Sequence, residues 1–83
     1  MPEYIAYVTA PLAEADRLRD AITPDQPANA VQINGSDAEV YMEFGAPSFS
    51  DALKQLVQTY ANLRKAAGLE PLDPESAKIG PAV

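Results

Sequence analysis

An Asn-Gly step between two alternating segments is the feature that most restricts how this chain can fold. The step, Asn34-Gly35, lies within AVQINGSDAEVYMEF, residues 30–44. Asn-Gly is a preferred dipeptide of tight β-hairpin turns, and the flanking residues alternate between apolar and polar, as in half-buried strands. The sequence therefore predicts two antiparallel strands joined at this turn, with one apolar face.

Two registers of the hairpin keep apolar residues on one face. A loop of two residues pairs Val31 with Ala38, and a loop of four residues pairs Val31 with Val40. A loop of three residues is excluded, because it would set Val31 against Glu39 and turn polar residues toward the apolar face.

The segment before the hairpin predicts a strand followed by a helix. Residues 3–9, EYIAYVT, are rich in β-forming residues, and both faces of the expected strand are apolar, which is typical of a central strand. Residues 11–22 carry apolar side chains at spacings of three and four, the pattern of an amphipathic helix. Pro24 is expected to end that helix by residue 23.

The segment after the hairpin predicts the main helix of the core. Ser48 is expected to cap its N-terminus, with Asp51 three residues further on, and Gly68 is expected to end it. Apolar residues between these ends follow helical spacing, so we expect them to face the core. They are Phe49, Leu53, Leu56, Val57, Tyr60, Leu63 and Ala67.

At 83 residues the chain is long enough for one hydrophobic core. The expected element order is β-α-β-β-α, and its simplest closed arrangement is α+β: a ferredoxin-like two-layer sandwich with an antiparallel sheet and both helices on one face. We predict a single domain over residues 1–68. Residues 69–83 are proline-rich and acidic, and they form either a tail or, from residue 76, a short edge strand.

Such a sandwich leaves one face of the sheet uncovered by helices. Glu39, Tyr41 and Glu43 alternate with apolar residues of the hairpin and are expected on this face. The first strand contributes one of two sets, either Tyr4 with Ala6 and Val8 or Ile5 with Tyr7. The candidate partner-binding residues are therefore Tyr4, Tyr7, Glu39, Tyr41 and Glu43.

The composition excludes several kinds of chemistry. The chain has neither cysteine nor histidine, which excludes thiol and Ser-His nucleophiles and leaves no ordinary zinc site. Glu39 and Glu43 would lie about 13 Å apart along a strand, too far for a pair of catalytic carboxylates. We therefore assign no catalytic residue, no metal site and no cofactor.

Twelve acidic residues against six scattered basic residues give a net charge of −6. Phosphate backbones repel a chain of this sign, so we expect no nucleic-acid binding and a partner protein with a basic patch. No apolar run approaches the length of a membrane span, and no secretory signal is recognised. A cytoplasmic protein without membrane contact is the expectation.

The opening Met1-Pro2, followed by a predicted strand and helix, resembles the start of the tautomerases, in which an N-terminal proline amine acts as the catalytic base. The resemblance covers residues 1–22 and implies catalysis by Pro2 if Met1 is removed. Tautomerases also bind carboxylated substrates through arginines, whereas Arg17 and Arg19 are expected on a helix surface without aim at Pro2.

A second resemblance concerns the fold. EYIAYVTAPLAEADRLRDAI, residues 3–22, is similar to the opening strand and helix of the divalent-cation-tolerance proteins, which are ferredoxin-like trimers. It spans about a quarter of the chain, and the later segments do not follow it. The resemblance implies the same fold and does not imply metal binding.

These observations favour a small, acidic, non-enzymatic protein-binding module of the inhibitor, immunity, antitoxin or effector-subunit type. It would bind its partner through the uncovered sheet face, and a homodimer through that face is a further expectation. The alternative is a ligand-binding regulatory module that acts as a homo-oligomer. A tautomerase-like enzyme that uses Pro2 is the third hypothesis.

Overall fold

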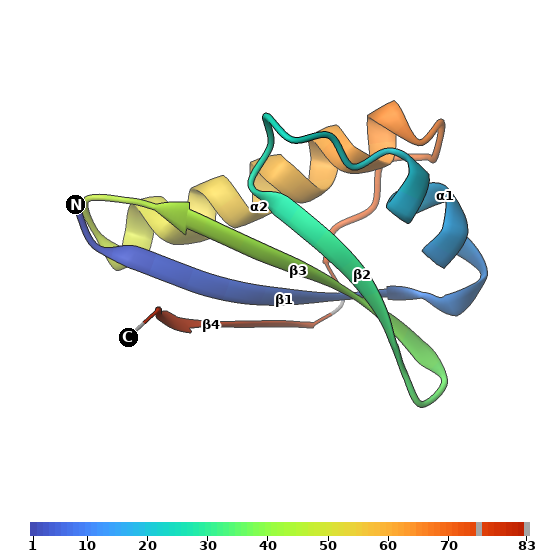
Figure 1. Ribbon diagram of the computed structural model, residues 1–83, viewed down its shortest axis with the longest axis horizontal. Helices are drawn as coiled ribbons and strands as arrows, with labels where there is room; N and C mark the ends of the chain where they lie inside the picture. The colour runs from blue at the N-terminus through green and yellow to red at the C-terminus, as the bar shows by residue number, and fades with distance from the viewer. Residues whose placement is uncertain (75, 83) are drawn as a thin grey trace.

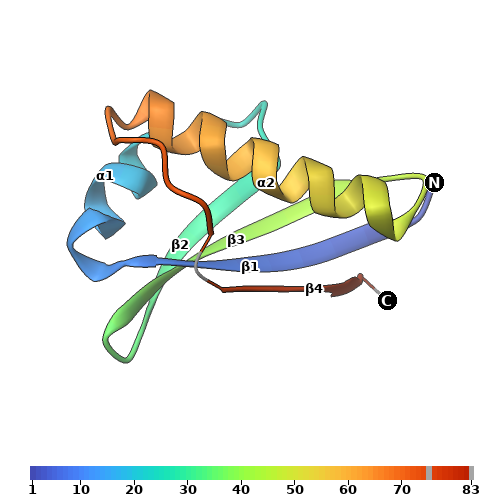
Figure 2. The same cartoon turned by 180° about the vertical axis from the view of Figure 1, so that it is seen from behind.

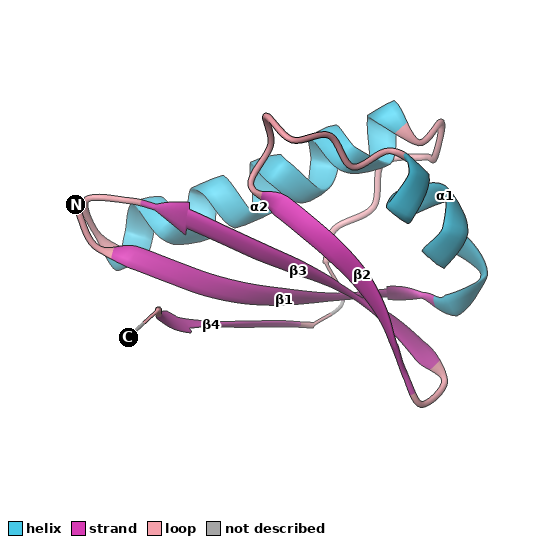
Figure 3. Cartoon of the chain, in the orientation of Figure 1, coloured by secondary structure: helices cyan, strands magenta, loops and turns pink. Residues whose placement is uncertain are grey.

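The computed structural model describes residues 1–74 and 76–82; Glu75 and Val83, both in the predicted tail, lie outside the described residues. The fold is α+β, with a four-stranded antiparallel sheet and two helices on one of its faces (Figures 1 and 3). The elements are β1 (Glu3–Pro11), the 3₁₀ turn η1 (Leu12–Glu14), α1 (Ala15–Asp20), β2 (Ala28–Asn34), β3 (Asp37–Gly45), α2 (Phe49–Ala66) and β4 (Ala77–Pro81).

The first strand lies inside the sheet, whose strand order is β2-β3-β1-β4. β1 pairs antiparallel with β3 along its whole length and with β4 over Tyr4–Val8. It is two residues longer than predicted, because Pro11 keeps an extended backbone (φ −58°, ψ 135°) and still pairs with Asp37. Ala77–Pro81 adds the edge strand on the other side of β1.

The hairpin adopts one of the two expected registers. Val31 pairs with Val40, as the longer loop requires, but the turn itself is Gly35-Ser36 and Asn34 pairs with Asp37. Gly35 has a φ of +64°, which suits the first central position of a type II′ turn. The tip projects beyond the helices (Figure 1), so Ile33 is 54% exposed and contributes little to the core, contrary to its apolar pattern.

The predicted helix over residues 11–22 is wrong in its extent. It forms as one 3₁₀ turn and six α-helical residues, and no side chain caps either start. The short α1 is instead held by arginines: Arg17 Nη2 donates to the carbonyls of Ala67 and Gly68, both at 3.0 Å, and Arg19 Nη2 donates to Val31 O at 3.1 Å.

The second helix begins where the sequence predicts, because Ser48 Oγ accepts a hydrogen bond from Asp51 N at 3.2 Å. The chain leaves it through Gly68, which has a φ of +73°. α2 lies over the sheet between β2 and β4 (Figure 2). Its buried apolar residues are Ala52, Leu56, Tyr60 and Leu63.

Part of the apolar stripe predicted to face the core is exposed. Phe49, Leu53 and Val57 keep 50%, 40% and 47% of their surface accessible, and we call these three residues the apolar flank. Leu53 and Val57 each follow a buried residue by one position, which turns their side chains about 100° away from it. The predicted stripe is thus wider than the face that the sheet can bury.

The core lies between α2 and one face of the sheet. On β1 and β3 it takes even-numbered residues, since side chains alternate across a strand. The largest fully buried side chains are Tyr60, Leu18, Met42, Leu56, Leu63, Val8 and Val40. The odd-numbered residues of these two strands therefore point to the opposite face of the sheet.

We predict that Ser48→Ala lowers the free energy of unfolding by about 1 kcal/mol, because it leaves the Asp51 amide without its capping acceptor. Urea unfolding measures the change. Ser50→Ala is the matched control, since Ser50 is exposed within the first turn and is expected to change stability by less than about 0.5 kcal/mol. Equal effects of the two substitutions would contradict the assigned cap.

Candidate functional site

The sheet face opposite the helices carries the candidate site, and we call it the open face. Its residues come from alternate positions of β1 and β3 and from β4: Ile5, Tyr7, Thr9, Glu39, Tyr41, Glu43 and Lys78. Tyr7 lies at its centre, because it pairs with Tyr41 on one side and with Lys78 on the other. Figures 1 and 2 show both helices on the other side of the sheet.

Two tyrosine rings form the middle of the open face. The ring centroids of Tyr7 and Tyr41 are 5.2 Å apart, with the planes inclined by 47°. Both residues are half-buried although no helix covers them. Each ring covers part of the other, and their positions on neighbouring strands of a sheet hold them in place.

Hydrogen-bonded carboxylates lie on both sides of this ring pair. The Tyr41 hydroxyl donates to Glu43 Oε1, and Asn34 Nδ2 donates to Glu39 Oε1 at 3.2 Å. Glu39 and Glu43 therefore have preferred positions before any partner arrives. A partner that meets them would lose less of its binding free energy to side-chain ordering.

The hydrogen bond to Glu43 raises the pKa of Tyr41 to about 12, with smaller contributions from desolvation and from the charge of Glu43. The Tyr41 phenol is then neutral at physiological pH and remains a hydrogen-bond donor. A group with so high a pKa is poorly suited to proton transfer near neutrality.

Four of the five predicted partner-binding residues share the open face, and Tyr4 does not. Tyr4 lies on the helix side of the sheet, stacked on Phe44 with a centroid distance of 6.4 Å and edge-on to Phe49 at 6.4 Å. Tyr4 and Tyr7 are three residues apart on one strand, so alternation puts them on opposite faces. The set Ile5 with Tyr7 is the one that faces outward.

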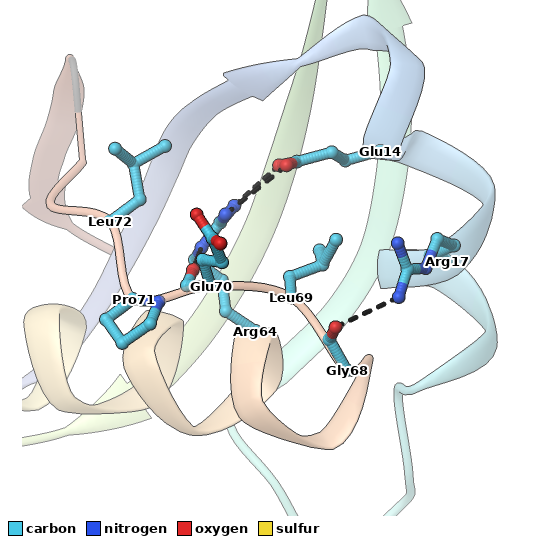
Figure 4. Close-up of a pocket in the computed structure, with 8 residues that line it drawn as sticks. All are labelled: Glu14, Arg17, Arg64, Gly68, Leu69, Glu70, Pro71 and Leu72. Carbon is cyan, nitrogen blue, oxygen red and sulfur yellow. Dashed lines mark hydrogen bonds and ion pairs between the residues drawn. The ribbon is translucent and has the colours of Figure 1, made fainter.

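A pocket of about 360 Å³ near the end of α2 is the second candidate (Figure 4). Its centre is Arg64, which is 3% exposed. Arg64 Nη1 donates to Glu14 Oε1 at 2.5 Å, and Arg64 Nε donates to Glu70 O at 2.8 Å. Arg64 Nη1 also donates to the hydroxyl of Tyr60 at 3.3 Å. The bond to Glu14 raises the pKa of the Arg64 guanidinium.

The charges of this pocket are used within the chain. Glu14 belongs to η1, Arg64 to α2 and Glu70 to the segment that leads to β4, so the guanidinium ties three segments together. Arg17, which also lines the pocket, donates to the carbonyls at the end of α2. The pocket is therefore a structural junction in which the side chains of Arg64, Glu14 and Arg17 already have partners. Sequence reasoning missed it, although Arg64 follows Tyr60 by four positions on the core side of the helix.

The elements of the tautomerase hypothesis lie far apart. Pro2 is exposed, and its carbonyl accepts a hydrogen bond from Ala46 N at 3.0 Å. Arg17 and Arg19 follow the opposite end of β1 and bond to backbone carbonyls there. Across residues 1–74 and 76–82, no group of three or more carboxylates is placed to hold a metal ion.

Comparisons with protein-family models, with curated proteins and with solved structures each found no match to this chain. Among the described residues, neither helix has the length and apolar character needed to cross a bilayer.

We predict that the Tyr41 ring titrates with a midpoint near pH 12 in the wild type, as followed by the NMR shifts of its ring carbons. In Glu43→Gln the midpoint should fall toward the ordinary value of about 10, because the accepting carboxylate is gone. Glu39→Gln is the control and should leave it unchanged. A wild-type midpoint at the ordinary value would contradict the Tyr41–Glu43 bond.

We predict that Glu14→Ala lowers the free energy of unfolding by about 2 to 3 kcal/mol, because it leaves the buried Arg64 without its carboxylate. Asp16→Ala removes the carboxylate of the exposed Arg19–Asp16 pair and should cost less than about 0.5 kcal/mol. Thermal and urea unfolding measure both. If the two substitutions cost the same, Arg64 does not depend on Glu14 as described.

Proposed function

We propose that this protein is a small non-enzymatic protein-binding module that uses its open face to bind a partner protein with a basic patch. The observation that carries the proposal is the Tyr7–Tyr41 ring pair, flanked by positioned carboxylates on a sheet face that no helix covers. Inhibitors, immunity proteins, antitoxins and effector subunits act in this general way.

The ring pair supports a role in recognition. Tyrosines are enriched among the residues that dominate binding energy, because a ring buries a large area at low entropy cost and its hydroxyl can still form hydrogen bonds. The two rings are also suited to an arginine or lysine side chain, which binds over an aromatic face. Tyr7 and Tyr41 are therefore the proposed anchors.

The charge of the open face supports a basic partner over a second copy at this surface. Glu39 and Glu43 outnumber Lys78 there, and the whole chain carries −6. Two open faces brought together would set acids against acids, whereas a basic surface would be attracted. We therefore propose a heterologous complex at the open face and not the homodimer through that face.

We further propose the ferredoxin-like class for the fold. Three features support this proposal: the order of elements along the chain, which reads β-α-β-β-α-β when β4 is counted, the two helices on one face, and the place of β1 between β3 and β4. The alternative function, a ligand-binding regulatory module, needs a pocket with unpaired polar groups. It has less support, since Arg64 and Glu14 bind each other.

The proposal is tested by NMR titration with a short arginine-rich peptide as the probe. We expect shift changes centred on Tyr7 and Tyr41. The double variant Glu39→Lys, Glu43→Lys should weaken binding at least about tenfold. The control Asp20→Lys, Asp73→Lys raises the net charge by the same four units at exposed positions outside the open face, and it should bind within about twofold of the wild type.

Equal weakening by both double variants would show only general charge attraction and would contradict a defined site. Shift changes confined to another surface would also contradict it. The same two double variants can then be used to capture partner proteins from cells. A captured protein supports the proposal only if the Glu39→Lys, Glu43→Lys variant fails to bind it and the control variant still binds it.

A further inference from the structure

A second uncovered apolar surface lies between α2 and β4. The apolar flank, Phe49, Leu53 and Val57, is on the β4 side of the helix. Val57 precedes Arg64 by two helical turns and so shares its side of α2, and Arg64 Nε donates to Glu70 O in the segment that leads to β4. Figure 2 shows the chain leaving α2 and descending to β4 along this side. The flank therefore lies above β4, the edge strand on this side of the sheet.

The backbone of β4 has a free hydrogen-bonding edge. Thr9 N donates to Ser76 O at 2.8 Å at one end of the strand. Ala82 N donates to Glu3 O at 2.9 Å at the other end. Even-numbered residues of β4 thus face β1, and in an antiparallel ladder the odd-numbered residues then direct their backbone groups outward. These outward residues are Ala77, Ile79 and Pro81.

The other edge of the sheet is more protected. Arg19 of α1 donates to the carbonyl of Val31 in β2, so a side chain of the same chain already occupies part of that edge. Among the described residues, no hydrogen bond from another segment reaches the outer edge of β4. Exposed strand edges are templates for pairing with another strand.

We propose that a second copy of this chain covers this surface: β4 pairs antiparallel with β4 of the second copy about a two-fold axis at Ile79, and the two apolar flanks meet above the seam. In this register Ile79 faces itself and exchanges two hydrogen bonds. The carbonyl of Pro81, which has no N–H to offer, accepts from Ala77 of the other copy. On the helix side of the joined sheet, the side chains that oppose each other across the seam are then all apolar: Ala77, Ile79 and Pro81.

Charge and register both favour this occupant. No residue of β4 or of the apolar flank is acidic, so a chain of net charge −6 can meet itself here without opposing carboxylates. A register centred on Lys78 would set two lysines directly opposite each other, which is unfavourable. The Ile79 register instead places Lys78 opposite Gly80. A two-fold pairing also closes after two copies and leaves the open faces free.

The test is sedimentation velocity of the whole chain over a concentration series. The wild type should form a dimer, with a dissociation constant below about 0.1 mM. Val57→Lys should raise that constant at least about tenfold, because it places charge in the apolar seam. Asn62→Lys, exposed on the same helix but away from the flank, is the matched control and should dimerise like the wild type.

Ile79→Pro probes the strand pairing, since it removes an outward N–H without removing a bond to β1, and it should also weaken the dimer. Circular dichroism shows whether each variant is folded. A wild type that stays monomeric to about 1 mM overturns the proposal. Three other results overturn it as well. They are a Val57→Lys variant that dimerises like the wild type, assembly into species larger than a dimer, and binding of the monomer to neutral phosphatidylcholine vesicles through the flank. The Glu39→Lys, Glu43→Lys variant should dimerise normally, so this result is independent of the partner at the open face.

Discussion

The placement of β1 between β3 and β4 is the constraint on which the rest of the structure depends. Because both of its edges are paired, the strand has no freedom to rotate, and alternation sends each side chain to a fixed face. Its helix side carries the small residues Ala6, Val8 and Ala10, all buried, which leaves room for α2 to pack closely. The large polar-tipped Tyr7 consequently faces outward, where it meets Tyr41.

The buried guanidinium of Arg64 connects this sheet to the segments that complete it. Its bonds to Glu14 and to the carbonyl of Glu70 fix the start of the chain that runs from α2 to β4. Placing that segment brings β4 against β1, which sets Lys78 beside Tyr7 and leaves the edge at Ile79 free. One internal ion pair thus helps to position both surfaces to which we assign binding.

Local patterns were enough to predict the elements that depend on neighbouring residues. The hairpin at Gly35 and the capped start of α2 at Ser48 follow from turn and capping chemistry, which acts over a few positions. The short α1 was not predictable in the same way, since its length reflects how far β1 extends and where Arg17 finds carbonyls on α2. These are contacts between residues distant in the sequence.

The candidate site shows the same division. The alternation that puts Glu39, Tyr41 and Glu43 together is visible in the sequence, whereas the choice between Tyr4 and Tyr7 is set by which face of β1 the helix covers. The sequence pattern assigns the apolar flank of α2 to the core, whereas the structure exposes it. Periodicity shows that a helix has an apolar stripe, but it does not show how much of that stripe the sheet can bury.

The central claim is that β1 and β3 present one face to α2 and the opposite face, with Tyr7 and Tyr41, outward. NMR nuclear Overhauser contacts between side chains test it most directly. We expect contacts between the Tyr7 and Tyr41 rings, contacts from the Met42 methyl to side chains of α2, and none from either of these rings to α2. Contacts from the Tyr7 or Tyr41 ring to α2 within one molecule would contradict the account.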